Sequence, residues 1–283
     1  MIKYFLENHT FNYLPKDKKW KMVWNDEFDG SQLDESKWSF RTNYWGYPSP
    51  TFTKEGVVLD GNSHLQLHLI EKDGNFYSPH LQTGSLTFDI PKDSKGFWPF
   101  GKRQEPKFMH KYGYYEICCK FPKNDGWHSA FWLQAPGIGS HPDPKQCGVE
   151  VDIIENYKLY TDNKIGCGNG WGGYGKDSKW YGHMWFDFEE TDDGWHRYGV
   201  DWSKDGYRFY HDGILTGIQE APVSDVEQFI LVSTECHGYH KSMNRGGLES
   251  KFGVQGQPDE KLFKAVLPDY FEVDYVRVFD EVK

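Results

Sequence analysis

Apolar and polar residues alternate with a period of two in short segments along most of the chain. This alternation is typical of β-strands that are buried on one side. Gly, Asn and Asp turn residues separate the segments, and no segment of helical length keeps a 3.6-residue period. The pattern predicts strands at 64–69, 113–121, 129–134, 195–202, 207–210, 229–235 and 271–279.

Many short strands without helices predict an all-β fold, an antiparallel β-sandwich of the jelly-roll type. The chain has 283 residues, and no linker-like stretch divides it. We therefore expect a single domain over 1–283. Residues 1–19 are polar and irregular, and we expect them to form a lead-in that packs late or frays.

One stretch combines the alternation with unusual chemistry. In residues 148–157, Glu150 and Asp152 alternate with Val149 and Val151, so the two acids should share one strand face. Glu155 lies five residues after Glu150 and belongs on the other face of a regular strand. A one-residue bulge at Ile153-Ile154 would return it to the carboxylate side. Three acids in a row repel one another, so at least one should hold its proton near neutral pH, as acid-assisted bond cleavage requires.

The same stretch has a plainer interpretation as a half-exposed strand whose acids face water. Near the C-terminus the chain repeats Glu272-Val273-Asp274, but the fifth position after Glu272 is Arg277. We expect one of the two segments to be a site and the other an ordinary strand. Spacing alone leaves the choice open.

Aromatic residues make up 18% of the chain, with 12 Trp, 18 Tyr and 20 Phe. Trp and Tyr combine a flat apolar face with a polar group, which suits the binding of flat, hydroxyl-bearing ligands. Large β proteins are also rich in aromatic residues for reasons of packing. The composition is therefore compatible with a carbohydrate-binding surface without requiring one.

The formal net charge of −10 argues against nucleic acid as a partner, which would require a basic face. No apolar run is long enough to span a membrane, so no membrane partner is expected, and we expect a monomer. The first residues do not form a signal peptide, so the protein is expected either in the cytoplasm or secreted with its signal removed. The five cysteines have no zinc-site spacing and are expected to be reduced and buried.

Longer motifs resemble family 16 of the glycoside hydrolases, the group of laminarinases, lichenases, agarases and carrageenases. The resemblance covers the chain from Trp20 to about Phe279. It rests on six segments in order, at 23–30, 112–116, 126–133, 150–155, 195–202 and 273–278. The segment 150–155 matches the family's Glu-x-Asp-x-x-Glu signature in its bulged form.

This resemblance implies a concanavalin A-like jelly roll with a concave substrate cleft. It also implies retaining cleavage of internal β-1,3 or β-1,4 bonds of a β-glucan or galactan, with a polysaccharide or oligosaccharide as the partner. By motif position, Glu150 is the expected nucleophile, Glu155 the general acid/base and Asp152 an assisting residue between them. Retention requires two carboxyl groups roughly 5–5.5 Å apart, which neighbouring residues on one strand face can supply.

The resemblance also suggests substrate-binding residues. Trp127, Trp132 and Trp171 are the candidates for stacking on sugar rings, although Trp132 could equally be a core residue. Trp45 and Trp98 lie in expected loops and could wall the cleft. His128, His183 and Arg41 could contact sugar hydroxyls, or could be ordinary packed or surface residues.

Two features bear on substrate and cofactor. The Asn-x-Glu-x-Gln pattern of many laminarinase-like members is absent from residues 42–48, so a galactan remains as open as a β-glucan. No cofactor is expected for catalysis, but family members often hold a structural calcium, here expected near Asp274 and Glu27. A transglycosylase on the same site and a non-catalytic carbohydrate-binding protein are the alternative functions.

Overall fold

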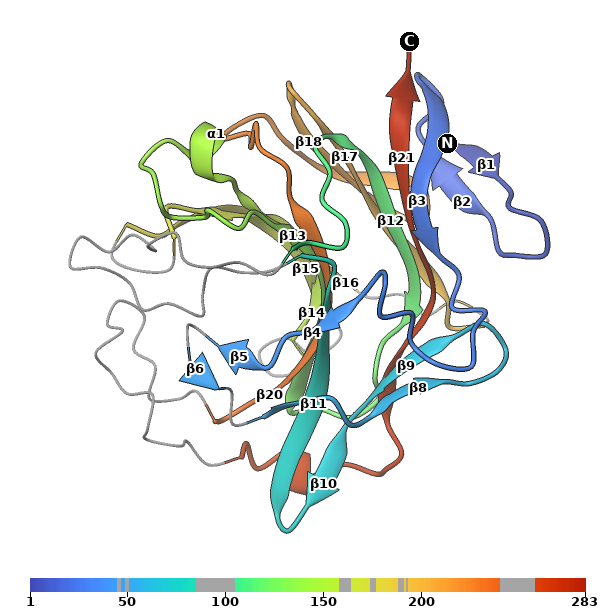
Figure 1. Cartoon of the computed structure of the whole chain (residues 1–283), viewed down its shortest axis with the longest axis vertical. Helices are drawn as coiled ribbons and strands as arrows, with labels where there is room; N and C mark the ends of the chain where they lie inside the picture. Colours follow the sequence, from blue (N-terminus) through green and yellow to red (C-terminus); the bar gives the residue numbers. More distant parts are fainter. Residues whose placement is uncertain are drawn as a thin grey trace.

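Two β-sheets packed face to face form the protein (Figure 1). The computed structural model describes residues 1–44, 47–48, 51–84, 105–157, 164–173, 177–187, 191, 193–239 and 258–283. Within these residues the pairing is antiparallel throughout both sheets, apart from β7, which runs parallel to β11. The predicted all-β, antiparallel sandwich is therefore confirmed.

The first sheet, which we call the site sheet, has nine strands in the described part of the chain. Its order is β10-β11-β20-β13-β14-β15-β16, with β4 and β7 also paired to β11. The strands are β4 (Ser39–Phe40), β7 (Phe52–Thr53), β10 (Ile70–Lys72), β11 (Asn75–Gln82), β13 (Trp127–Gln134), β14 (Glu150–Asn156), β15 (Lys164–Trp171), β16 (Lys179–Asp187) and β20 (Phe229–Cys236).

The second sheet, which we call the back sheet, has eight strands among the described residues. Its order is β19-β18-β17-β12-β21-β9-β8, with β3 paired to β21. The strands are β3 (Lys19–Asp26), β8 (Val57–Leu59), β9 (Leu65–His68), β12 (Gly113–Lys120), β17 (His196–Ser203), β18 (Gly206–His211), β19 (Ile214–Gln219) and β21 (Tyr270–Val282).

The remaining elements are short. They are β1 (Ile2–Tyr4), β2 (Asn12–Leu14), β5 (Asn43–Tyr44), β6 (Tyr47–Pro48), the helix α1 (Pro144–Cys147) and the 3-10 turn η2 (Leu262–Lys264). Among the described residues, none of the helices is both long and apolar enough to cross a bilayer.

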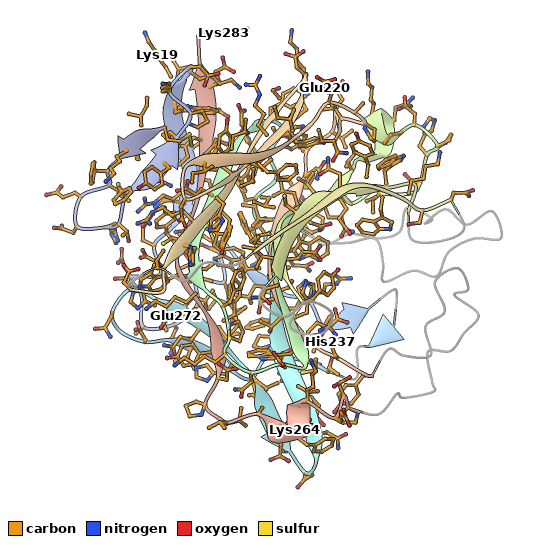
Figure 2. All side chains as sticks on the ribbon, turned by 180° about the vertical axis from the view of Figure 1, so that it is seen from behind. Lys19, Glu220, His237, Lys264, Glu272 and Lys283 are labelled. Carbon is orange, nitrogen blue, oxygen red and sulfur yellow. The ribbon has the colours of Figure 1, made fainter. Side chains whose placement is uncertain are left out.

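The core lies between the two sheets, where side chains fill the space (Figure 2). The period of two turns alternate residues inward, for example Val151 of β14 with Val149 just before it, and Ile117, Val200 and Val276 of the back sheet. Each of these five side chains is fully buried. Burying one such side chain contributes roughly 1.5–3 kcal/mol to the stability of the fold. Burial of the inward-facing residues therefore stabilises the packing of the two sheets. The five cysteines are also free and buried, as predicted.

The N-terminal segment differs from the expected fraying lead-in. Residues 1–19 include β1 and β2, which pair with each other beside β3 and β21 (Figure 1). Asn12 is fully buried and donates a hydrogen bond to Glu116 of β12, and Leu14 is buried as well. Fraying is therefore not observed for Asn12 and Leu14, because they are buried against the back sheet despite the polar, irregular composition of the segment. Whether the segment packs late stays a prediction.

The strand containing Glu272 and Asp274 is structural, as its lack of a third acid suggested. Its Arg277 is fully buried and forms a double contact with Glu27 of the adjacent segment, at 2.8 Å and 2.6 Å. The guanidinium also lies 3.7 Å from the centre of the Tyr275 ring. A buried guanidinium requires such partners, because an unpaired buried charge is strongly destabilising.

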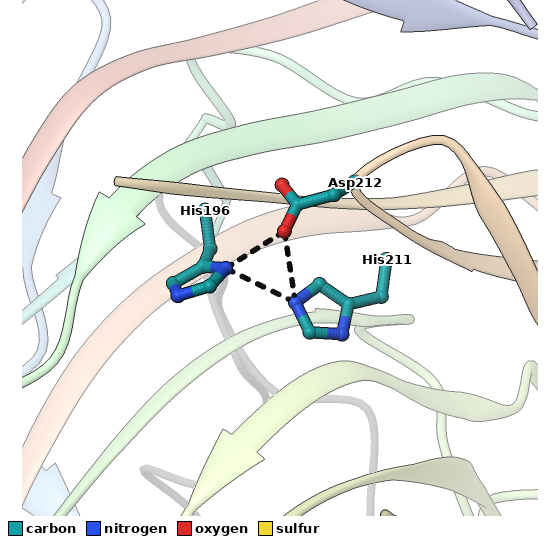
Figure 3. A group of neighbouring side chains, drawn as sticks. All are labelled: His196, His211 and Asp212. Atoms are coloured by element: carbon teal, nitrogen blue, oxygen red, sulfur yellow. Dashed lines mark hydrogen bonds and ion pairs between the residues drawn. The ribbon is translucent and has the colours of Figure 1, made fainter. Parts of the chain in front are cut away.

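A carboxylate and two imidazoles connect β17 to the end of β18 (Figure 3). Asp212 Oδ2 lies 2.7 Å from His196 Nδ1 and 3.1 Å from His211 Nε2, and Asp212 Oδ1 accepts the Arg197 amide. Burial alone would raise the pKa of Asp212. The hydrogen bonds from His196 and His211 outweigh burial, so this pKa lies below its usual range.

We predict that Asp212→Asn lowers the free energy of unfolding by about 2 kcal/mol at pH 7, because charge-assisted hydrogen bonds are lost. A lowered carboxyl pKa stabilises the fold above the unfolded-state pKa and loses that contribution as pH falls. The difference between wild type and variant should therefore shrink toward pH 3. Urea denaturation at several pH values measures it, with Asp205→Asn in the exposed β17–β18 turn as the control. Equal stability of the two variants would contradict the role of Asp212.

Candidate active site

The predicted bulge is present in β14. Against β13, Asp152 is opposite Trp132 and Glu155 is opposite Ala130, so three steps on β14 match two on β13. The register toward β15 shifts at the same place, between Asp152 and Glu155. One extra residue in β14 therefore brings Glu155 to the same face as Asp152.

The two isoleucines explain why the bulge forms here. Ile153 and Ile154 are consecutive, yet both belong to the core between the sheets and both are at most 2% exposed. A regular strand would turn one of them away from the core. The bulge lets both pack inward, and the following Glu155 then lies on the face of the site sheet turned away from the back sheet. We call this the site face.

The three carboxyl groups on the site face are crowded and nearly buried. Glu150, Asp152 and Glu155 are each at most 6% exposed. Burial, followed by the charge of Glu155, raises the pKa of Glu150 well above its usual range. Burial and the charges of Glu155 and Glu150 do the same for Asp152. The cluster is thus arranged to hold protons that isolated carboxyl groups would lose.

The surroundings distinguish the three groups. Gln134 on β13 donates a hydrogen bond to Glu150 Oε2 at 2.9 Å, and the Arg41 charge acts to lower the pKa of Glu150. Both contacts favour the ionised form of Glu150. Among the residues that the structure describes, no group donates a hydrogen bond to Asp152 Oδ2. Glu150 therefore has partners that favour its ionised form, whereas within the described part of the chain Asp152 Oδ2 has none.

Trp132 lies on the site face, directly opposite Asp152. Its indole Nε1 donates to Ser233 Oγ at 2.9 Å, and its ring is partly exposed rather than part of the core. The Arg41 guanidinium lies 5.9 Å from the ring centre. The structure therefore brings two of the expected binding residues, Trp132 and Arg41, to the three acids.

His128 lies beside Glu155. Its Nε2 is 3.3 Å from Glu155 Oε1, an ion-pair distance without hydrogen-bond geometry. The imidazole stacks on the Tyr157 ring at 4.2 Å between centroids, and the Tyr157 hydroxyl hydrogen-bonds Glu155. His237 Nε2 contacts the Tyr157 backbone carbonyl at 2.7 Å. A role of His128 in contacting sugar hydroxyls stays a prediction.

Two expected stacking residues point the other way. Trp127 is opposite Cys236, is 0% exposed and packs with Leu69 and Phe76 in a second core cluster. Trp171 packs against the main core on the side away from the acids. Stacking on sugar by Trp127 and Trp171 is therefore corrected to core packing. Strand parity provided the signal, because Trp127 and Trp132 are five residues apart in a regular strand and must face opposite sides.

Three other expected residues cannot be placed. Trp45 and Trp98 lie outside the described residues. His183 lies within β16, but its side chain is outside the described part of the structure.

Two residues that the sequence analysis overlooked are on the site face. His80 on β11 is 3% exposed, and in the described part of the chain neither of its ring nitrogens has a hydrogen-bond partner. Burial, then the charge of Arg41, lowers its pKa well below the usual value, so the ring is neutral and offers one donor and one acceptor. Trp180 on β16 is 49% exposed and is opposite Gly170 of β15. Neither residue lies in a strand predicted from the sequence, so no strand face was assigned to it.

The expected calcium ligands have other partners. Both carboxylate oxygens of Glu27 contact Arg277, which leaves Glu27 poorly suited to a cation. Asp274 accepts a hydrogen bond from Thr10. Beside Glu27 lies a cavity of about 240 Å³, none of whose lining residues belongs to the site sheet. Among the described residues, two other groups could hold a metal ion, His196 with His211 and Asp212, and Asp60 with His64 and Glu272.

The chain is similar to curated proteins and to solved structures. The chain is 28% identical over 203 residues to glucan endo-1,3-beta-glucosidase A1 of Niallia circulans, which covers 68% of this chain and 28% of that protein. It is 26% identical over 260 residues to beta-porphyranase B of Zobellia galactanivorans, which covers 82% of this chain and 79% of that protein. The match thus spans little more than a quarter of the first relative's length.

The fold is similar to that of the catalytic domain of an endo-1,3-beta-glucanase (laminarinase) from Thermotoga petrophila. The TM-score is 0.65 at 22% identity, covering 94% of this chain and 100% of that one. At this identity the likeness shows the fold alone. The family model described as glycosyl hydrolases family 16 matches residues 50–221, more than half of the chain, and includes the bulged strand. The chain therefore belongs to family 16 of the glycosyl hydrolases.

Proposed function

We propose that this protein is a retaining endo-β-glycosidase that hydrolyses internal β-1,3 or β-1,4 linkages of a polysaccharide. The observation that carries the proposal is the bulge in β14, which gathers three buried carboxyl groups on one strand face. Retaining cleavage requires one ionised and one protonated carboxyl group close together. The electrostatics of this site favour that combination.

In the first step, the ionised Glu150 carboxylate attacks the anomeric carbon and forms a covalent glycosyl ester. Glu155 gives its proton to the departing glycosidic oxygen, so the leaving sugar departs with a hydroxyl group. In the second step, Glu155, now ionised, takes a proton from a water molecule. The resulting hydroxide attacks the anomeric carbon, the ester bond breaks, and Glu150 returns as a carboxylate.

Asp152 assists as a proton-holding neighbour of the nucleophile. Burial and the charges of both glutamates raise the pKa of Asp152 well above its usual range, which favours its protonated form. A neutral acid between two glutamates limits the negative charge of the cluster and can donate a hydrogen bond to it.

The substrate is proposed to be a β-glucan or a galactan. Curated relatives include endo-1,3-beta-glucosidase A1 and three beta-porphyranases of Zobellia galactanivorans. Similarity to both groups, together with the absent Asn-x-Glu-x-Gln pattern, supports testing both polymer classes. A panel of β-glucans and red-algal galactans with product sizing addresses this, and products longer than the substrate would indicate transglycosylation.

We predict that Glu150→Gln lowers kcat/KM by at least about 10³-fold, because the nucleophile is lost. The matched control is Glu272→Gln, which alters the same Glu-Val-Asp sequence in the back sheet. Glu272 lies in β21 of the back sheet, whereas Glu150 lies in β14 of the site sheet. The control should retain wild-type activity. A Glu150→Gln protein with activity close to wild type would refute the assignment.

We expect Glu155→Ala to lose activity on polysaccharide but to react with an aryl glycoside that has a good leaving group. Such a leaving group needs no proton, so the first step proceeds while the second step lacks its base. Mass spectrometry should then detect a covalent glycosyl adduct on Glu150. Failure to trap any adduct would count against the two roles.

The pH dependence of the first step should respond to Glu155. Activity on the same aryl glycoside is lost as pH falls through the pKa of Glu150, which the Glu155 charge raises. Glu155→Gln removes that charge, so the pKa of Glu150 falls and the acidic limb of kcat/KM moves to lower pH. A limb that stays in place or moves upward would show that Glu155 does not act on Glu150 in this way.

Chelation tests the proposed structural calcium. We expect EDTA to leave kcat unchanged, because every chemical step uses carboxyl groups and water. A calcium ion near Asp274 would show itself as a melting temperature that falls after chelation and recovers when calcium is added. Loss of kcat well below the melting temperature would contradict the proposed independence of catalysis from metal.

A further inference from the structure

Three potential metal ligands converge where β17 meets the end of β18 and the turn that follows it (Figure 3). Oδ2 of Asp212 lies 2.7 Å from Nδ1 of His196 and 3.1 Å from Nε2 of His211. The two ring nitrogens are 3.2 Å apart. These three atoms form a small triangle with one ligand atom from each side chain, which we call the His-His-Asp triangle.

Hydrogen bonds alone do not satisfy all three edges of the His-His-Asp triangle. Each ring nitrogen carries at most one hydrogen, and an ionised carboxylate carries none, so at most two hydrogens serve three edges. If both hydrogens point to Asp212, the two donor nitrogens face each other at 3.2 Å. If one points to the other ring instead, a nitrogen lone pair faces the carboxylate. A cation held by the lone pairs of all three atoms removes this conflict.

The dimensions of the triangle are close to those of a small divalent cation site. Zinc binds imidazole nitrogen and carboxylate oxygen at roughly 2.0–2.2 Å. At angles of about 90–110° between ligands, neighbouring ligand atoms then lie roughly 2.9–3.5 Å apart. The edges of 3.1 and 3.2 Å fall inside this range. The edge of 2.7 Å would widen slightly when the cation replaces the shared hydrogens.

The carboxylate of the triangle is held in place by the backbone of β17. Oδ1 of Asp212 accepts the Arg197 amide at 2.8 Å, and the Asp212 amide donates to the Arg197 carbonyl at 2.8 Å. Asp212 and Gly213 both have a positive φ, 47° and 81°, in the tight turn between β18 and β19. Hydrogen bonds of this kind orient the ligands of metal sites. They fix one carboxylate oxygen and leave Oδ2 beside the two imidazoles.

The triangle is accessible from one side. The side chain of Asp212 is 27% exposed and that of His211 is 14% exposed, whereas His196 is only 2% exposed. An ion can therefore enter beside Asp212 and keep a water ligand there. Within the described residues, Asp212 forms ion pairs with these two histidines only, so no lysine or arginine of that part of the chain takes the place of a cation.

We infer that His196, His211 and Asp212 bind a divalent transition-metal ion of the zinc type. Two imidazoles select such an ion over calcium, which prefers oxygen ligands. The bound ion links β17 to the turn between β18 and β19, and so stabilises the back sheet. The three acids lie on the face of the site sheet that is turned away from the back sheet, so the ion takes no part in the proposed reaction. The inference does not depend on the proposed function.

The other group of potential ligands, Asp60, His64 and Glu272, is less suited to zinc. It offers a nitrogen from one residue only, and Glu272 lies 3.9 Å from the Lys120 ammonium group. This group provides the control, because His64→Gln removes a histidine from it without touching the His-His-Asp triangle.

The first experiment measures zinc binding by chelator-treated protein without a histidine tag. Calcium is present in excess in every sample, so that a calcium ion near Asp274 contributes equally to all of them. Calorimetric titration with zinc should show about one site per chain. Saturating zinc should raise the melting temperature by at least about 3 °C, because the ion binds the folded state. Absence of zinc binding to the wild type would overturn the inference.

The second experiment locates the ion with His211→Gln, Asp212→Asn and the control His64→Gln. We expect the first two to weaken zinc binding at least about 100-fold, since each removes a ligand, and His64→Gln to bind as the wild type does. His211→Gln carries the decision, because Asp212→Asn is expected to be less stable even without zinc. Binding by His211→Gln equal to the wild type would overturn the inference, and so would loss of binding in His64→Gln alone.

Activity provides a separate measurement. On any polysaccharide that the wild type cleaves, His211→Gln should keep the wild-type kcat with or without zinc, because the triangle lies in the back sheet. A kcat that follows zinc occupancy would overturn the proposed role of the ion as a structural link. Failure of the wild type to cleave any polysaccharide would refute the proposed function and leave the zinc titrations to decide this inference.

Discussion

Three carboxyl groups share one strand face in this protein because two isoleucines both enter the core. Packing of Ile153 and Ile154 gains roughly 1.5–3 kcal/mol for each side chain, and the bulge that permits it turns Glu155 toward Glu150 and Asp152. The acids then raise one another's proton affinity. A raised carboxyl pKa means that the folded state holds protons that the unfolded state releases, so the contribution of the cluster to stability falls as pH rises. The cluster therefore holds protons near neutral pH, and it lowers the free energy of unfolding as pH rises.

The back sheet also contains buried carboxyl groups, but there they are paired with hydrogen-bond donors and an arginine. Glu116 is buried, and burial raises its pKa to about 7, although hydrogen bonds from Tyr275, Tyr114 and Asn12 act to lower it. Nearby, Glu27 is neutralised by Arg277. These carboxyl groups are surrounded by donors supplied partly by the N-terminal hairpin. The carboxyl groups of β14 instead face one another, which is the difference between a structural and a reactive set of acids.

The side chains around the acids differ on the two neighbouring strands. β13 presents Gln134, Trp132 and His128 beside them, whereas β15 presents Gly166, Gly168 and Gly170 opposite them. One neighbouring strand thus surrounds the acids with polar and aromatic side chains, and the other contributes no side chain there.

The alternation of residues was enough to predict the sandwich, the strand 150–155 and its bulge. Those features depend on local periodicity and on which residues can be buried, and both are visible in the amino-acid order. The faces of Trp127 and Trp171 did not follow from the predicted strands, because Trp127 lies before the predicted strand 129–134 and no strand was predicted around Trp171. Once β13 and β15 are defined, parity separates Trp127 from Trp132 and Trp171 from Gly170.

Other features depended on contacts between residues far apart in the chain. Three contacts require the strands to be paired in a particular register. Asn12 is buried against Glu116 and Arg277. The pKa of His80 is lowered beside Arg41, and the Trp180 ring packs over Gly170. Register between distant strands is set by the fit of the whole core and not by any one segment. The sequence by itself therefore determined the fold class and the strand that carries the three acids, while the tertiary structure decided which side chains surround those acids.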